Sequence, residues 1–240
     1  MVRRLIDLSR PISHMMPVAN PHVNQVPAFW HRLTHESERG THKHSDISFQ
    51  IRDFLIGEHV GTHVDALCHF TPSPDAPAIA DMELEWFFAD AICVDVSHIT
   101  PLSFIEVDDL KVAVAKTGLT VKPGSTFLYF QDYYARQDQP NWLHEFAGLT
   151  GDATHWLADQ GVKNIGCETA SIDCSTAMPK DANPSFPAHR ACRDRGIINT
   201  ENLANLDKVV GKAFTYIGLP LPLVGGTGSP IRAVALLEDA

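Results

Sequence analysis

The 240-residue sequence lacks several features that would place it in a membrane or on a nucleic acid. It has no apolar run of about 18 residues, which is the minimum for a membrane-spanning helix. Asp7 interrupts the apolar start, so we expect no signal peptide. Lys and Arg number 19 against 29 Asp and Glu, a formal net charge of −10 without any basic stripe. That balance argues against a nucleic-acid or anionic-membrane partner.

Cysteine chemistry is also poorly represented. The chain has five cysteines, an odd number, and no C-x-x-C pair. Scattered thiols of this kind are typical of reduced, buried side chains in the cytoplasm rather than of a disulfide framework or a zinc–thiolate site. The sequence therefore predicts a cytoplasmic protein with these residues in its core: Cys68, Cys93, Cys167, Cys174 and Cys192.

Three common catalytic motifs are absent: the G-x-S-x-G elbow, the H-E-x-x-H helix and the Walker phosphate loop. The glycine-rich run 225–230 has no following Lys to meet a phosphate, so by itself it predicts a turn between strands. We find no internal repeat, low-complexity tract or linker. With 44% apolar and 20% charged residues, we expect one globular domain spanning residues 1–240.

Histidine, by contrast, is abundant, with 13 residues, and several gather in the stretch 59–70. Read as an extended chain, this stretch alternates between two faces. One face is small or apolar; the other carries His59, Gly61, His63, Asp65, Leu67 and His69. A helix would also bring His59 and His63 together at i and i+4. Glycine and β-branched residues between them favour a strand, which we expect to enter a loop near Ala66.

Two histidines and an aspartate on one face are typical of a metal site. Neutral imidazole and carboxylate suit Zn²⁺, Mn²⁺ or Fe²⁺, and a site without Cys ligands favours catalysis over structure. The alternative is an ordinary polar strand face exposed to solvent. Three His and one Asp in register within eleven residues favour the metal site, with His59, His63 and Asp65 as ligands.

The pattern His-x-Gly-Thr-His-x-Asp-x-x-x-His resembles the signature of the cyclase-like metal-dependent hydrolases, a family that includes bacterial kynurenine formamidases and isatin hydrolases. The family has Pro where this chain has Leu67. Further matches are the segments around His189 and Glu201 and the run 229–232. Asp173 also matches a family aspartate, and we assign it no role.

The resemblance implies a mixed α/β domain with a swivelling β/β/α fold and a barrel-like sheet. It implies that His189 binds a second metal ion and that Glu201 and Asp65 bridge the two ions. The cofactor expected is Zn²⁺ or Mn²⁺, as one or two ions. The partners expected are a small-molecule substrate and further copies of the chain, as a dimer or tetramer.

This set of residues predicts a hydrolase of a small amide, lactam or imide. A metal ion lowers the pKa of bound water to about 7, so hydroxide can attack a carbonyl carbon. His69, with an ordinary pKa near ~6.5, suits a proton shuttle to the leaving amine. The alternatives are a lactone or dienelactone hydrolase with the same site, and a catalytically silent metal-binding module.

One departure bears on the substrate. Where kynurenine formamidases have a Trp after the first strand, the corresponding run 16–21 of this chain has Ala19. Losing that ring face should weaken binding of an aromatic substrate, so we expect the chain to be a poor kynurenine formamidase.

Periodicity and punctuation predict the elements. We expect strands over 5–9, 91–96, 126–130, 162–167, 197–198, 214–224 and 231–237. We expect helices from a capping box at Ser103 to about 119, over 152–160, and over 187–195. Residues 17–40 read as a long loop, and 45–58 as a strand that feeds the histidine motif. The loop histidines should be solvated or line a pocket: His31, His35, His42 and His44.

Overall fold

A nine-stranded mixed sheet forms the centre of the computed structural model, which describes residues 3–18, 26–35, 48–177 and 185–238. In spatial order its strands are β1 (Arg3–Asp7), β13 (Val234–Glu238), β11 (Ala213–Ile217), β5 (Phe88–Asp95), β7 (Thr126–Phe130), β9 (Asn164–Cys167), β10 (Ile198–Glu201), β4 (His63–Asp65) and β12 (Gly228–Pro230). Strands β5, β7, β9 and β10 are parallel, and the pairs that flank them are antiparallel. The expected mixed α/β class with a barrel-like sheet is confirmed.

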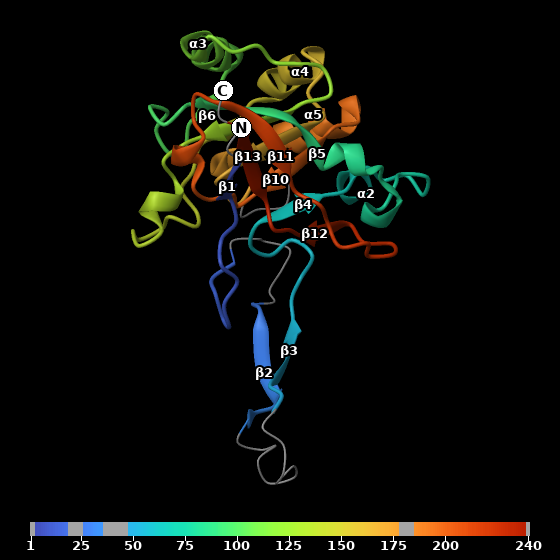
Figure 1. The fold of residues 1–240 in the computed structure, drawn as a ribbon. Helices are drawn as coiled ribbons and strands as arrows, with labels where there is room; N and C mark the ends of the chain where they lie inside the picture. Colours follow the sequence, from blue (N-terminus) through green and yellow to red (C-terminus); the bar gives the residue numbers. More distant parts are fainter. Residues whose placement is uncertain (1–2, 19–25, 36–47, 178–184, 239–240) are drawn as a thin grey trace.

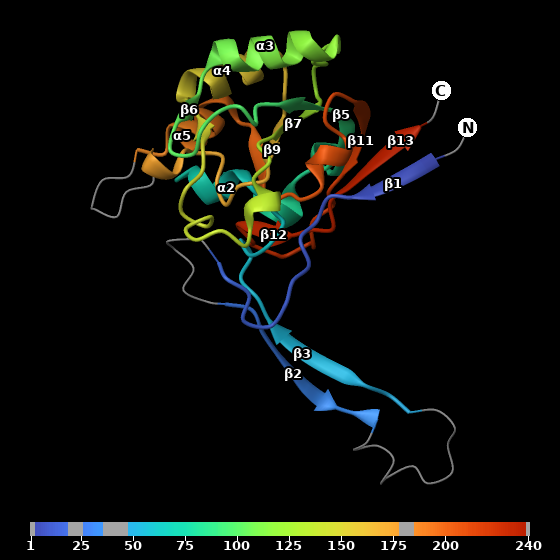
Figure 2. The same ribbon diagram turned by 90° about the vertical axis from the view of Figure 1, so that its left-hand side faces the viewer.

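Alternating side chains of the central strands feed two apolar cores. Along β7, Leu128 faces one core, whereas Phe127 and Tyr129 face the other. The first core fills the inside of the sheet. The second lies between the sheet and three helices, α3 (Val107–Thr117), α4 (Gly151–Asp159) and α5 (Pro187–Arg195), which gather on one face (Figures 1 and 2). A strand buried on both faces reads as a continuous apolar run, which is why 126–130 is predicted to the residue.

Helix ends follow the local signals in the sequence. α5 begins with Pro187 at its first position and ends at Gly196 in a left-handed conformation, as predicted. α3 ends as expected at Gly118. Its capping box is formed by Glu106 and Asp109, so the prediction of a box starting at Ser103 is wrong. The residues just before it form β6 (Phe104–Ile105), which pairs with β8 (Gly148–Leu149).

A two-stranded arm projects from the body, as both ribbon views show (Figures 1 and 2). It consists of β2 (Ala28–Leu33) and β3 (Ile51–Leu55), paired antiparallel. The prediction of a structureless loop over 17–40 is therefore wrong where β2 lies. The strand expected within 45–58 exists but pairs with β2 instead of joining the central sheet. Ala19, His42 and His44 lie outside the described residues.

The histidine motif itself differs from a continuous strand. Only His63–Asp65 is extended, as β4, and His59 precedes it in a turn in which Gly61 has a φ of +68°. After Ala66 the chain enters the four-residue helix α2 (Leu67–Phe70) instead of a loop. The strand predicted over 214–224 ends at Ile217, because the Gly-Leu-Pro sequence that follows cannot continue the ladder.

Short 3₁₀ turns complete the described elements, at Ile79–Asp81, Leu84–Trp86, Tyr134–Arg136, Ser175–Ala177 and Leu206–Lys208. Across the described ranges, every helix is too short or too polar to cross a membrane.

Candidate metal centre

The predicted ligands meet at the carboxyl ends of the parallel strands β9 and β10. Strand β4 lies between β10 and β12, and its register places His63 opposite Glu201. Because paired residues in a sheet share a face, both side chains point to the same side of it. Asp65, two residues further along β4, also shares this face. The edge of a sheet where parallel strands end is a common place for a ligand site.

Three imidazoles of the site, two of them buried and that of His189 half-buried, are each held through one ring nitrogen. Nδ1 of His63 donates to the Gly61 carbonyl over 2.9 Å. Nδ1 of His189 lies 2.5 Å from Oδ2 of Asp173. Nε2 of His59 lies 2.9 Å from Oγ1 of Thr227. Such anchoring fixes both the ring orientation and the nitrogen that remains for a metal ion.

The other nitrogens converge on the two buried carboxylates. Nε2 of His63 lies 3.5 Å from Oδ1 of Asp65 and 3.5 Å from Oε2 of Glu201. Nε2 of His189 lies 3.5 Å from the remaining oxygen of each, Oδ2 and Oε1. Each carboxylate therefore presents one oxygen to His63 and the other oxygen to His189. Nδ1 of His59 lies 2.7 Å from Oδ1 of Asp65.

This donor set fits divalent ions. Four ligands about 2.1 Å from a metal ion at tetrahedral angles lie roughly 3.4 Å apart. The observed 3.5 Å separations match that spacing and exceed an ordinary N–H···O hydrogen bond of about 2.9 Å. The chemistry of the set, imidazole and carboxylate without thiolate, suits Zn²⁺ or Mn²⁺. His63, Asp65 and Glu201 form one buried group of potential ligands.

The carboxylates are supported by an amide. Nδ2 of Asn199 donates to Oδ2 of Asp65 over 2.9 Å and to Oε1 of Glu201 over 3.0 Å. The Ile172 backbone N–H also donates to Oε1 of Glu201. Two carboxylates are thus held side by side at the bottom of the site.

Burial and mutual charge decide the protonation of this cluster. Burial lowers the pKa of His63 to about 4, so it is neutral at pH 7, as a ligand must be. Burial and the Asp65 charge hold the pKa of Glu201 well above its usual range. Burial also acts to raise the pKa of Asp65, but the His189 and His59 rings beside it outweigh burial and keep that pKa well below its usual range. A cation bound between the two carboxylates would favour the ionised form of both.

The pKa of His189 is shifted in the opposite direction to that of His63. Burial lowers its pKa, but its hydrogen bonds with Asp173 and Asp65 outweigh burial and raise the pKa well above the usual value. Asp173 also accepts from the Ala188 backbone N–H over 2.6 Å at the start of α5. The aspartate to which the sequence assigns no role thus positions His189 and caps the helix that carries it.

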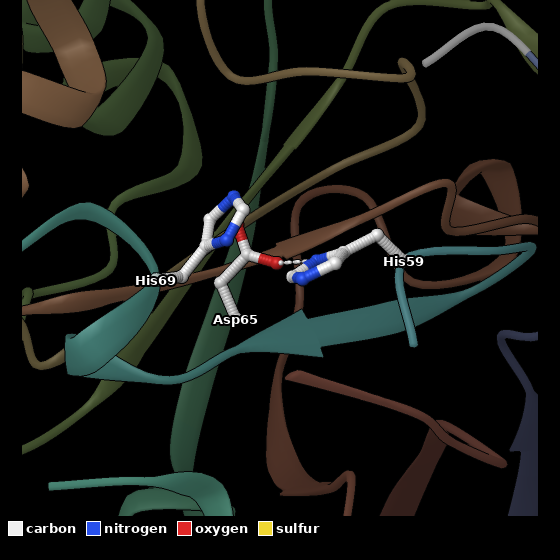
Figure 3. A group of neighbouring side chains, drawn as sticks. All are labelled: His59, Asp65 and His69. Carbon is white, nitrogen blue, oxygen red and sulfur yellow. Dashed lines mark hydrogen bonds and ion pairs between the residues drawn. The ribbon is translucent and has the colours of Figure 1, made fainter. Parts of the chain in front are cut away.

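His69 lies at the outer side of the site. Figure 3 shows His59, Asp65 and His69 pointing toward one another from the turn, β4 and α2. The His69 ring centre lies 4.1 Å from that of His59 and 6.4 Å from that of His189. The side chain is exposed, unlike the three anchored imidazoles. His59, Asp65 and His69 also form a second group of potential ligands.

The structure places the other sequence candidates elsewhere. His31 lies on the exposed arm and His35 contacts Ser48, so neither joins the site. All five cysteines are free; four are buried, and Cys68 is only half-buried, with its Sγ near the Gly226 carbonyl. The supports that sequence reasoning missed are Asn199 and Thr227. A period-two reading from Glu201 along its strand points to Asn199, whereas no local signal marks Thr227.

A small cavity opens beside His59. Its walls include Met16, Pro17, Val18 and Leu143, with Arg10 and Asn202 as polar members. Arg10 is buried, and its guanidinium lies over the rings of Tyr134 and Trp142 at 5.1 and 4.9 Å. A larger hollow at the amino ends of β5 and β7 is lined by Asp90 and Ser125 and contains none of the predicted site residues. Of these two hollows, the cavity beside His59 is the one that borders a predicted ligand.

The chain is similar to known proteins in sequence and in fold. A family model described as putative cyclase matches residues 6–174. The kynurenine formamidase of Salinibacter ruber is 30% identical over 236 residues, 98% of each protein. The isatin hydrolase of Roseibium aggregatum is 29% identical over 198 residues, 78% of this chain and 74% of that protein. An isatin hydrolase structure bound to the product analogue thioisatinate has a TM-score of 0.85 at 23% identity, covering 99% of this chain and 93% of the other. That structural similarity supports the fold.

Replacing Gly228 by Ala should damage this centre. A Cβ at Gly228 would lie 2.7 Å from Cε1 of His59 and 2.9 Å from the Val64 carbonyl oxygen. The His59 ring must then leave its place beside Asp65, so we expect G228A to lose metal affinity by at least ~10-fold, the cost typical of disturbed ligand support. The measurement is titration with a metal-sensitive dye. G151A, whose new Cβ meets its nearest atom at 3.4 Å, is the matched control; equal affinities of the two variants would contradict the assignment.

Proposed function

The chain belongs to the cyclase family, and from this premise we propose that it is a metal-dependent hydrolase of a carbon–nitrogen bond in a small amide, lactam or imide. The observation that carries the proposal is the paired arrangement of donors, in which Asp65 and Glu201 each present one oxygen to His63 and one to His189. Three imidazoles and two carboxylates would hold one or two ions of Zn²⁺ or Mn²⁺: His59, His63, His189, Asp65 and Glu201.

When bound, the metal supplies a water with a pKa near ~7 and polarises the substrate carbonyl. The chain's own residues supply position and proton transfer. Asn199, Asp173 and the Gly61 carbonyl hold the ligands in place before substrate arrives. Such preorganisation means that little reorganisation is needed during the reaction.

His69 is proposed as the proton-transfer residue. It is exposed, so its ring nitrogens exchange protons with solvent, and it stands beside His59 at the entrance. An imidazole is suited to this task near neutral pH. In the proposed reaction, His69 donates a proton to the leaving nitrogen as the carbon–nitrogen bond breaks.

Apolar side chains beside His59 support a substrate that carries a cyclic or aryl group: Met16, Pro17, Val18 and Leu143. The substrate panel should therefore contain small cyclic amides and imides, an aryl formamide, N-formylkynurenine and small lactones, each with added Zn²⁺ or Mn²⁺. Preferred hydrolysis of lactones would favour the lactonase alternative, and inactivity on every member would favour a silent metal-binding module.

His63→Ala should lose bound metal and activity together. It removes a proposed ligand, and even loss of a residue that only supports a ligand costs about 10–100-fold in affinity or activity. Metal content by elemental analysis and rates on the panel measure this. Exposed His98→Ala is the control. A metal-loaded, active H63A protein would refute the ligand assignment.

His69→Ala should keep metal content near wild type and lower kcat by roughly 10²–10⁴-fold, the usual contribution of a positioned acid or base. Paired metal analysis and kinetics on the same preparation test this, with His98→Ala again as control. Loss of metal in proportion to activity would make His69 a ligand, as its grouping with His59 and Asp65 allows.

We also propose a homo-oligomer assembled through the β2–β3 arm. An isolated two-stranded hairpin is only marginally stable in water, yet the arm exposes large apolar side chains: Trp30, Ile51, Phe54 and Leu55. A second copy offers an apolar surface beside 79–88, where Leu84 and Phe88 are exposed. Three acidic residues there, Asp81, Glu83 and Glu85, complement Arg52 of the arm, whereas Arg32 is paired with Asp53.

Phe54→Ser should therefore shift the protein from oligomer to monomer. Phe54 is 66% exposed within its own chain, so the change should leave the folded monomer intact. Size-exclusion chromatography with light scattering gives the mass, and circular dichroism gives the fold. Val112→Ser, on the exposed face of α3, is the control. A wild-type monomer, or an F54S oligomer of unchanged mass, would contradict the role of the arm.

A further inference from the structure

A hydrogen-bonded chain leads from His59 away from the candidate metal centre. Nε2 of His59 lies 2.9 Å from Oγ1 of Thr227, and that hydroxyl donates to Oε2 of Glu58 over 2.7 Å. The Thr227 backbone N–H donates to the same carboxylate oxygen over 2.9 Å. Thr227 lies in the glycine-rich run that leads into β12, 168 residues from His59. The Glu58–Thr227 pair therefore joins two distant segments at the outer edge of one imidazole.

The donors and acceptors in this chain fix where the proton sits. An ionised carboxylate only accepts hydrogen bonds, and a threonine hydroxyl has a single proton to donate. Since Thr227 gives that proton to Glu58, its oxygen can only accept from His59. Nε2 of His59 must then carry a proton, which leaves Nδ1 as the nitrogen directed at the centre.

Nδ1 of His59 faces a carboxylate oxygen and therefore needs a bound proton or metal ion. Nδ1 lies 2.7 Å from Oδ1 of Asp65. A nitrogen lone pair against a carboxylate oxygen at that hydrogen-bond distance is repulsive unless a proton lies between them. A metal ion bound to both atoms would replace that proton and separate them to roughly 3.4 Å. Gly228 leaves room for the ring to lie in this orientation, since any Cβ there would meet Nδ1 at 3.1 Å.

We propose that Glu58 and Thr227 are positioning residues that hold His59 with its proton on Nε2 and so commit Nδ1 as its metal-binding nitrogen. This inference rests on the proposed function, because it presupposes a metal ion at the centre. It makes His59 the reverse of His63 and His189, which are anchored through Nδ1 and present Nε2. The glycine-rich run, which reads as a simple turn in the sequence, thereby acquires a role in the site.

Thr227→Val tests the proposal with almost no change of shape. The variant loses the hydroxyl oxygen that accepts the hydrogen bond from Nε2 of His59. We therefore expect Zn²⁺ affinity, measured by competition with a chelating dye, to fall by about 10–100-fold. Thr227→Ser keeps the hydroxyl and should restore affinity to within about 3-fold of wild type. Wild-type affinity in T227V would overturn the proposal.

Two further measurements separate positioning from a merely structural tie. Glu58→Ala should weaken Zn²⁺ binding in the wild-type background but add nothing in the T227V background, because both changes break one chain. Additive losses would overturn the proposal. Long-range ¹H–¹⁵N spectra of the Zn²⁺-loaded protein should show His59 protonated at Nε2 and metal-bound at Nδ1, and the reverse assignment would also overturn it.

The melting temperature of the metal-free variants provides the structural control. T227V and T227S should unfold alike without metal and differ only in Zn²⁺ binding. A loss of stability in T227V that accounts for its weaker binding would make the pair a structural tie and refute the inference. Failure of the wild-type protein to bind Zn²⁺ or Mn²⁺ would instead refute the proposed function, so the two failures are distinguishable.

Discussion

The carboxylate of Asp65 is the group on which the rest of the site depends. It is almost fully buried, and both of its oxygens are occupied: Oδ1 by His59 and His63, and Oδ2 by His189 and Asn199. A buried charge without partners is strongly destabilising. The strands that flank β4 and the helix that carries His189 therefore have to bring polar partners to this point. Removing Asp65 would leave those polar partners buried without an acceptor. The stability of the fold and the geometry of the site therefore both require this carboxylate.

Each imidazole around Asp65 is held by a different kind of acceptor. His63 uses a backbone carbonyl, His189 uses the Asp173 carboxylate, and His59 uses the Thr227 hydroxyl. The physical consequences differ, because a carboxylate increases the basicity of the ring while a carbonyl only orients it. The two imidazoles that face the carboxylates are consequently unequal: hydrogen bonding with Asp173 raises the pKa of His189 above its usual value, whereas burial lowers the pKa of His63 to about 4. Two ions bound there would meet different electrostatic environments.

Local signals in the sequence were sufficient for elements whose ends are marked by Pro or Gly. Helix α5 and strand β7 match the prediction to the residue, because Pro187, Gly196 and an unbroken apolar run specify them locally. The arm could not be predicted in this way, since β2 and β3 are separated in the sequence and neither has a strong period. The site likewise combines residues that local sequence marks and residues that only the tertiary fold brings in. The five predicted ligands do converge, but Thr227 is fixed only by the tertiary fold, which brings it to Glu58 from 169 positions away.

The end of strand β4 near Ala66, where the sequence predicts it, has a chemical consequence. A strand continued through His69 would place that residue roughly 13 Å from Asp65, at about 3.3 Å per residue. The chain instead turns at Ala66 into α2, which brings the His69 ring centre to 4.1 Å from that of His59. The turn also leaves His69 exposed, whereas the side chains of His63, His59 and His189 are 2%, 9% and 15% exposed. A group that exchanges protons with water must reach solvent, and groups that hold an ion bind it more strongly when shielded from solvent. The short helix satisfies both conditions within eleven residues, which an unbroken strand could not do.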